Sequence, residues 1–331
     1  MRKLNKKQII ILIILTTVVT VSIILVVYLI KNQNTYTSEP IVQESLGTGR
    51  ELSIDLENIE DEDVKDFKLW ELSAKVEIEN IENMALEIDS TLGLTDSEEG
   101  VYYYWSSADT DNYFQYTLLN NVLNFYIEDG IKWNEVELTG NSFSNFISKY
   151  FDKDWNYELT DTLNFTDGSV VFYAERKIYN DIPIETSELY NETDHLTLED
   201  GRITSGRILL TTFTDTEQYL PVLKVNVLSD YIDLSEYPKS IYFNSAEIAS
   251  VLSITDEYLN DEILKLQEEI TDCRATSGKI VYLYKSFEQK YLTPVYRLDL
   301  ECTADYEDDT YYISAVAFVS AVDPDYISAS E

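Results

Sequence analysis

The pattern of apolar and polar residues along the chain divides it into a hydrophobic start and a long mixed remainder. The run Ile9–Ile30 carries no charge, glycine or proline. Further along, Ile78, Ile81 and Ala85 begin a series of apolar residues spaced by three and four, which predicts an amphipathic helix over about 79–92. Gly93 follows this stretch, where a left-handed C-terminal cap is expected.

Most of the remaining pattern alternates and therefore predicts strands. The expected strands are 67–72, 101–107, 113–127, 169–179, 184–190, 195–198, 202–213, 221–227, 279–286, 290–300 and 311–322. Asp200-Gly201 is a strong two-residue hairpin signal between two of them. Short helices are predicted at 143–151, after a capping box that begins at Asn244, and at 256–270.

A helix followed by antiparallel strands thus recurs up to three times. This order predicts an α+β fold, in which an N-terminal transmembrane helix precedes repeated helix-plus-antiparallel-sheet modules. The expected divisions are a cytoplasmic tail (1–8), the transmembrane helix (9–30), an acidic tether (31–66) and three modules (67–140, 141–240 and 241–331).

The run Ile9–Ile30 is long enough, at ~1.5 Å per helical residue, to cross the ~30 Å hydrocarbon core of a bilayer. Lys and Arg residues precede it, which predicts a cytoplasmic N-terminus and an extracellular C-terminal part in a single-pass cell-membrane protein. Its length and the lack of an Ala-x-Ala site favour an uncleaved anchor. The alternative is late cleavage near Thr35–Ser38.

The formal net charge of −37 determines which partners are plausible. A field of that sign repels nucleic acid and attracts cations or basic partners, so we expect no nucleic-acid binding. A solubilising surface explains the acidity more simply than a dedicated basic ligand, although cations remain possible partners on the acidic surface.

The two cysteines, Cys273 and Cys302, flank a predicted hairpin and lie equally far from its tip at Phe287–Glu288. Residues equidistant from a hairpin tip face each other, so the two thiols are expected to meet. An oxidising exterior permits a disulfide between them. Two buried free thiols are the alternative.

Several segments resemble a known module. Phe172–Ala174, Tyr179–Ile184 and Asp200–Ile203 are similar to the "tyr-x-gly-ile-pro-val … asp-gly-x-ile" core of PepSY-like modules. Ser245–Ala249 and Tyr291–Tyr296 resemble the helix and the "leu-x-pro-val-tyr" strand of the same group. A membrane anchor followed by such repeats is similar to YycH/YycI-type regulators, which implies an extracytoplasmic regulator of a sensor histidine kinase.

The sequence contains no constellation that is typical of catalysis, and we predict a protein that is not an enzyme. His195 is the single histidine, which excludes a multi-histidine zinc site, and alternation places it on an exposed strand face. No glycine-rich phosphate loop occurs. We therefore predict no catalytic residue, metal or cofactor, although a carboxylate-based hydrolase remains a remote alternative.

Aromatic clusters are the candidates for a binding surface, with packing in the core as the simpler explanation. The residues concerned are Tyr102, Tyr104, Trp105, Tyr113, Tyr284 and Tyr291. The function that we expect is non-catalytic binding and regulation of another membrane or envelope protein. A module that binds envelope glycan, peptide or cations is the alternative.

Overall fold

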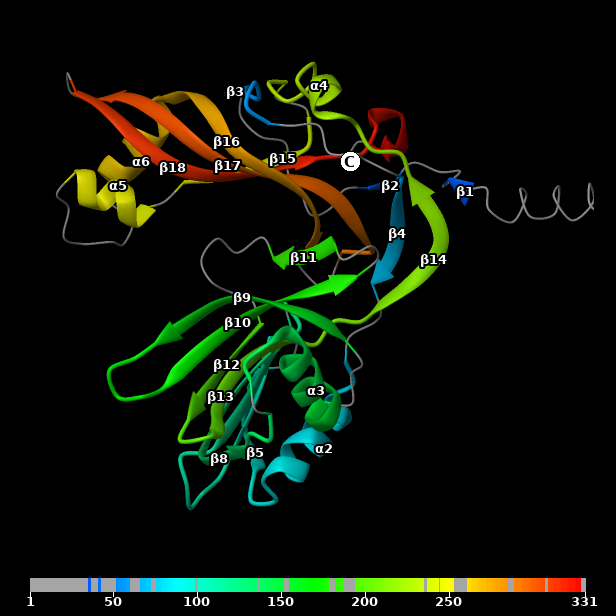
Figure 1. Ribbon diagram of the computed structural model, residues 1–331, viewed down its shortest axis with the longest axis vertical. Helices are drawn as coiled ribbons and strands as arrows, with labels where there is room; N and C mark the ends of the chain where they lie inside the picture. The colour runs from blue at the N-terminus through cyan, green and yellow to red at the C-terminus, as the bar shows by residue number, and fades with distance from the viewer. Residues whose placement is uncertain are drawn as a thin grey trace, which may run out of the picture.

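Antiparallel strands make up most of the computed structural model, and a few short helices pack against them (Figure 1). The structure describes residues 35–36, 41–42, 52–59, 66–72, 76–98, 101–118, 120–135, 137–151, 155–178, 182–186, 194–234, 237–243, 245–252, 261–284, 289–306 and 309–328. The elements form two lobes. We call them lobe I (residues 76–178 and 194–210) and lobe II (residues 52–59 and 223–322).

Lobe I contains an eight-stranded antiparallel sheet. Its strands are β5 (Gly93–Glu98), β6 (Tyr102–Ser106), β7 (Tyr113–Thr117), β8 (Val122–Lys132), β9 (Asn156–Asn164), β10 (Val170–Ile178), β12 (Asp194–Glu199) and β13 (Arg202–Leu209). The order across the sheet is β5-β6-β7-β8-β13-β12-β10-β9. Asp200 and Gly201 both have positive φ, 47° and 75°, as the predicted two-residue hairpin between β12 and β13 requires.

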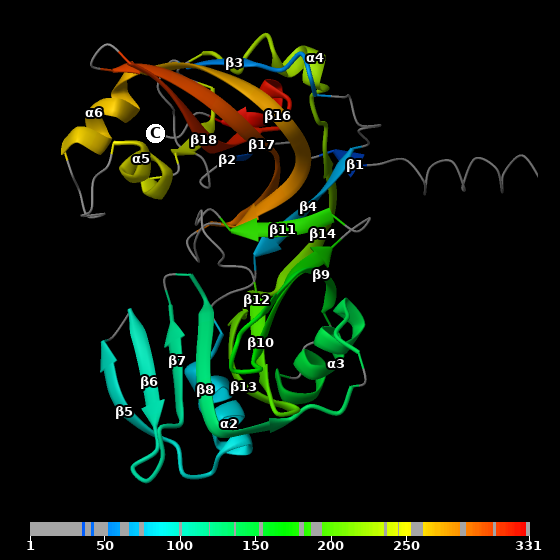
Figure 2. The same cartoon turned by 60° about the vertical axis from the view of Figure 1, so that its left-hand side comes forward.

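Two helices cover one face of this sheet, α2 (Ile78–Ile88) and α3 (Gly140–Phe151). The residues that face them, including Phe114, Phe125, Phe172 and Leu196, are almost fully buried. Gly140 lets helix α3 begin very close to β9. A Cβ at this position would lie 2.1 Å from the carbonyl oxygen of residue 157. On the opposite face of the sheet, the described part of the chain places no helix (Figure 2).

Lobe II is organised around three long strands, β16 (Ile270–Tyr284), β17 (Tyr291–Tyr306) and β18 (Asp309–Ser320). They pair antiparallel in that order, and β15 (Lys239–Phe243) joins the outer edge of β18. The short strand β3 (Ser53–Asp55) pairs in parallel with the first part of β16. The helices of this lobe are α4 (Val225–Leu228), α5 (Ser245–Val251) and α6 (Asp261–Glu269).

Three strands connect the lobes. β14 (Phe213–Leu220) leaves lobe I and pairs with β4 (Phe67–Leu72), which also pairs with the start of β17. β11 (Ile182–Thr186) pairs with β10 on one side and with β16 on the other. Near the termini, β1 (Thr35–Tyr36) adds to β14, and β2 (Ile41–Val42) pairs with β19 (Ile327–Ser328), which follows the 3₁₀ turn η1 (Pro324–Tyr326).

This architecture contradicts the predicted α+β fold of repeated modules behind a transmembrane helix. Strands dominate, and their hydrogen bonding runs through both lobes. The reason is long-range pairing, such as β8 with β13 and β11 with β16, which local periodicity does not reveal.

The predicted transmembrane helix Ile9–Ile30 lies outside the described residues. In the part of the chain that is described, every helix is too short or too polar to cross a bilayer.

Several predicted element bounds also need correction. Helix α2 ends at Ile88, where Asp89 N–H donates a hydrogen bond to the Ala85 carbonyl, and Gly93 begins β5 instead of capping the helix. The expected strand 221–227 is replaced in part by α4, which buries Val225 and Leu228 one turn apart. Periodicity missed β5 and β9, because β5 is exposed throughout and β9 is exposed along most of its length.

Candidate functional site

The helix-free face of the lobe I sheet carries an ordered set of tyrosine and polar side chains. Residues paired directly across antiparallel strands point to the same side, so the register identifies which side chains share this face. One row across the strands is Ser106, Tyr113, Tyr126, Ser205 and Thr197; the next is Tyr104, Gln115, Asn124, Arg207, His195 and Tyr173. We call these residues, together with Tyr102, the tyrosine face.

Three tyrosines of this face stack on one another across β6, β7 and β8. The ring centroids of Tyr104 and Tyr113 are 5.5 Å apart with planes 22° from parallel, and those of Tyr113 and Tyr126 are 6.1 Å apart at 24°. Each pair of this kind contributes about 0.5–1.5 kcal/mol beyond simple burial. Because the rings cover one another's faces, the row presents ring edges and hydroxyl groups to a partner.

The hydroxyl groups of Tyr113 and Tyr102 remain protonated at neutral pH. Burial raises the pKa of Tyr113 above its usual value near 10. A hydrogen bond from the Tyr102 hydroxyl to Asp96, at 2.7 Å, raises the pKa of Tyr102 in the same direction. These two tyrosines therefore offer neutral groups that both donate and accept hydrogen bonds.

Carboxylates lie at both ends of the tyrosine face, because Asp96 of β5 pairs with Tyr104 and Asp161 of β9 pairs with Tyr173. Between these ends, Arg207 lies in register between Asn124 and His195. The His195 ring lies 5.3 Å from the Tyr173 ring. Tyrosine and arginine are residues that protein interfaces favour at their centres.

The structure separates the aromatic residues that the sequence proposed as one binding surface. Tyr102, Tyr104 and Tyr113 lie half-exposed on the tyrosine face. Trp105 points to the helices and is 1% exposed, because it alternates with Tyr104 along β6. Tyr284 is also 1% exposed, and Tyr291 packs in lobe II against the cluster that contains Leu69.

Sequence reasoning missed Tyr126 and Arg207 as members of the face. The expected single strand over 113–127 is a hairpin of β7 and β8, and Asn121, with φ of 54°, lies in its turn. That turn brings Tyr126 opposite Tyr113. An asparagine pair at 120–121 between two alternating runs was the available signal.

A buried polar cluster lies near the junction of the two lobes, outside the tyrosine face. The Asp194 carboxylate accepts hydrogen bonds from the Tyr157 hydroxyl at 2.6 Å and from the Leu209 amide at 2.7 Å. The Arg176 guanidinium lies between the rings of Trp155 and Phe213, with its carbon 4.1 and 4.6 Å from their centroids. Burial raises the pKa of Asp194 and lowers that of Arg176.

A small cavity of about 20 Å³ adjoins Arg176 and Asp194. It has room for about one water molecule. The position of the cluster, between β10, β12 and the start of β14, indicates a structural role at the junction.

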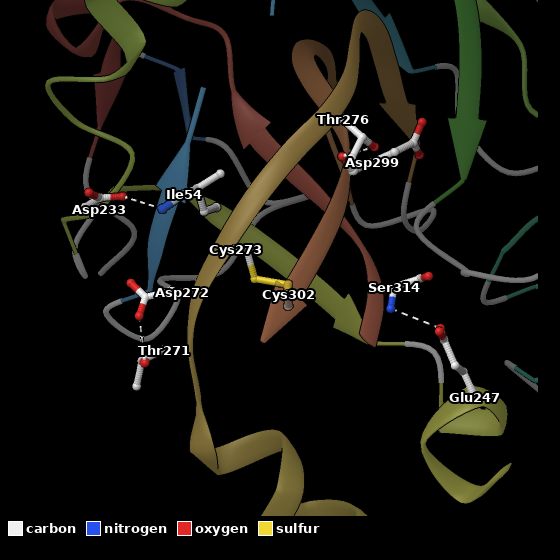
Figure 3. Close-up of a disulfide and its surroundings, with 10 residues drawn as sticks. All are labelled: Ile54, Asp233, Glu247, Thr271, Asp272, Cys273, Thr276, Asp299, Cys302 and Ser314. Atoms are coloured by element: carbon white, nitrogen blue, oxygen red, sulfur yellow. Dashed lines mark hydrogen bonds between the residues drawn. A yellow bond between two sulfur atoms is a disulfide. The ribbon is translucent and has the colours of Figure 1, made fainter. Parts of the chain in front are cut away.

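The structure joins Cys273 and Cys302 by a disulfide between β16 and β17 (Figure 3). The two residues are paired in register, and both are buried, at 5% and 0% exposure. Cys273 also lies opposite Ile54 of β3. The cross-link therefore holds the hairpin where the edge strand β3 attaches.

Among the described residues, no three His, Cys, Asp or Glu side chains are grouped closely enough to hold a metal ion.

In comparisons with known proteins, no protein-family model matches the chain, and no curated protein does. One solved structure to which it is similar is an uncharacterized protein from Eubacterium rectale, with 14% sequence identity, 88% of this chain and 91% of that chain covered, and a TM-score of 0.44.

Proposed function

We propose that this protein is a non-catalytic binding module that recognises another protein through its tyrosine face. The observation that supports this function is the stacked set of Tyr104, Tyr113 and Tyr126, with Arg207 on the same face of the sheet. Tyrosine supplies a large, rigid and amphipathic contact area at low cost in conformational entropy.

The geometry favours a protein partner over a glycan. Glycan sites need exposed ring faces, whereas the inner faces of these rings are covered by their neighbours. The hydroxyl groups and ring edges suit the mixed apolar and polar surface of a folded protein. The resemblance to YycH/YycI-type regulators supports an envelope partner such as a sensor kinase.

The environment of His195 supports a non-catalytic role. Its registered neighbours are Tyr173 and Arg207, and neither is the serine or cysteine that a histidine base activates in a catalytic triad. A hydrolase would also need two carboxylates on either side of a substrate. The carboxylates in register with this face, Asp96 of β5 and Asp161 of β9, lie on the two edge strands of the sheet with six strands between them.

Site-specific photo-crosslinking tests this proposal in cells. A benzoylphenylalanine is placed at position 104, 113 or 126, and at Tyr312 as a control, which is 63% exposed in lobe II. We expect one protein to be captured from all three lobe I positions and not from position 312. Equal capture from position 312, or no common product, would overturn the proposal.

A second measurement uses the captured protein in purified form. Tyr113→Ser and Arg207→Ser should each weaken its binding at least tenfold, since central tyrosine and arginine residues dominate interface energies. Tyr312→Ser should leave the affinity unchanged. Urea unfolding of each variant shows whether it is folded under the binding conditions.

We also propose that the folded part of the chain works outside the cytoplasm. The disulfide supports this, because such bonds persist mainly in oxidising compartments. Cells quenched in acid and treated with a polyethylene-glycol maleimide under denaturing conditions should show two modified cysteines only after reduction. Modification without reductant would contradict this location.

A further inference from the structure

A groove of about 520 Å³ lies in lobe II, between strand β3 and helix α4. Both views of the molecule show these elements close together, away from lobe I (Figures 1 and 2). Buried Ile54, Leu56 and Val225 contribute apolar atoms to its lining. The groove is thus distant from the tyrosine face and different from it in chemistry.

Three carboxylates also line the groove, those of Asp55, Glu57 and Asp233, and none of the lining residues that the structure describes is a lysine or arginine. They are not grouped closely enough to hold a metal ion together. Carboxylates distributed along a groove whose lining is part polar and part apolar suit a ligand with separated positive charges better than they suit a single cation.

Hydrogen bonds orient two of these carboxylates. Asp233 Oδ1 accepts a hydrogen bond from the Ile54 amide at 3.0 Å (Figure 3), and Asp55 Oδ1 accepts one from the Glu57 amide at 2.9 Å. The Ile54 amide points away from β16, on the open edge of β3, and Asp233 caps it. A peptide that added to β3 as a further strand would have to displace this bond, so recognition by side chains is favoured.

We propose that this groove binds a lysine- or arginine-bearing segment of a partner protein. The aliphatic stem of such a side chain packs on the apolar lining, while its charged end reaches the carboxylates at the rim. This site is separate from the function proposed above. The outcome of its test does not depend on whether the tyrosine face binds a partner.

The test uses the full chain and fluorescently labelled N-acetyl-tetralysine amide, with binding followed by anisotropy in 150 mM salt. This ionic strength reduces the Debye length to about 8 Å and so suppresses the general field of an acidic protein. The groove variant is D55N/E57Q/D233N. Asparagine at 55 and 233 retains the Oδ1 acceptors, which preserves both hydrogen bonds.

The matched control is E79Q/E82Q/E87Q, which removes the same number of charges from exposed positions on α2 in lobe I. We expect the groove variant to bind the probe at least tenfold more weakly than the unmodified chain, and the control to bind within twofold of it. An equal loss of affinity in the two variants would show that binding of the probe depends only on the net charge of the protein. An unchanged affinity in a folded groove variant would place the probe elsewhere, and either result overturns the proposal.

Discussion

At the scale of single residues, Arg176 shows how the fold stabilises a buried charge. Its side chain is 3% exposed, and Nη1 donates a hydrogen bond to the Leu209 carbonyl at 3.3 Å. Its remaining stabilisation comes from two aromatic rings and from the negative charge of Asp194. An arginine with this many partners on different strands fixes the start of β14 relative to lobe I.

Arg176→Met should lower the free energy of unfolding by about 3 kcal/mol or more, because it leaves the buried Asp194 without a compensating cation. The exposed Arg274→Met is the control and should change stability by less than ~0.5 kcal/mol. Urea unfolding measures both. In a double-mutant cycle, adding Asp194→Asn to Arg176→Met should recover part of the loss, and strict additivity would contradict the coupling.

Single residues also show where sequence reasoning succeeds and fails. The backbone preferences of Asp200 and Gly201 predict a hairpin turn, and the structure confirms it. The burial of Trp105 next to exposed Tyr104 follows from alternation once β6 is assigned. Tyr284 could not be assigned in this way, because the Asn121 amide that donates a hydrogen bond to its hydroxyl lies in the other lobe.

At the scale of elements, an ion-pair network joins the strands of the two lobes. Lys279 of β16 contacts Glu185 of β11 at 2.6 Å and Glu175 of β10 at 3.6 Å, and Arg297 of β17 contacts Glu185 at 3.0 Å. Such contacts follow from the position of β11 between β10 and β16. No local pattern in the sequence predicts that position.

Glu175 should make the stability of this junction depend on pH. Burial raises its pKa above the ordinary value of 4.5, so its contribution is fully present below that pH and is lost as the pH rises through the folded pKa. Relative to the unmodified chain, Glu175→Gln should become progressively more stable as the pH rises from 4 to 7. Urea unfolding at several pH values tests this, with the exposed Glu82→Gln as control. The prediction is contradicted if the stability of Glu175→Gln relative to the unmodified chain falls between pH 4 and pH 7.

The contribution of the disulfide to the stability of the β16–β17 hairpin can be estimated from the length of the loop that it closes. The two cysteines are 29 residues apart. Closing a loop of that size in the unfolded chain stabilises the fold by roughly 3–4 kcal/mol in the chain-entropy model. The C273A/C302A variant should lose about this much in urea unfolding. Dithiothreitol should destabilise the unmodified chain and leave the variant unchanged, and equal sensitivity of both would contradict the estimate.

At the scale of the whole molecule, the sequence predicted strands far better than it predicted their assembly. Alternation located β6, β10 and β12 because each buries one face against helices or neighbouring strands. The tyrosine face required the pairing of β8 with β13, which are separated by α3 and three further strands of the sheet. Pairings over such distances depend on packing of the complete core, so the tyrosine face can be identified only from the folded arrangement.

The net charge of −37 acts on the whole fold, and it leads to a last prediction about salt. Mutual repulsion among the carboxylates destabilises the compact state, and added ions screen it. The Tm should therefore rise between 20 and 500 mM sodium chloride. If screening alone acts, calcium chloride at matched ionic strength produces nearly the same rise. A much larger shift with calcium would instead reveal a specific cation site, and would return a cation-binding function to consideration.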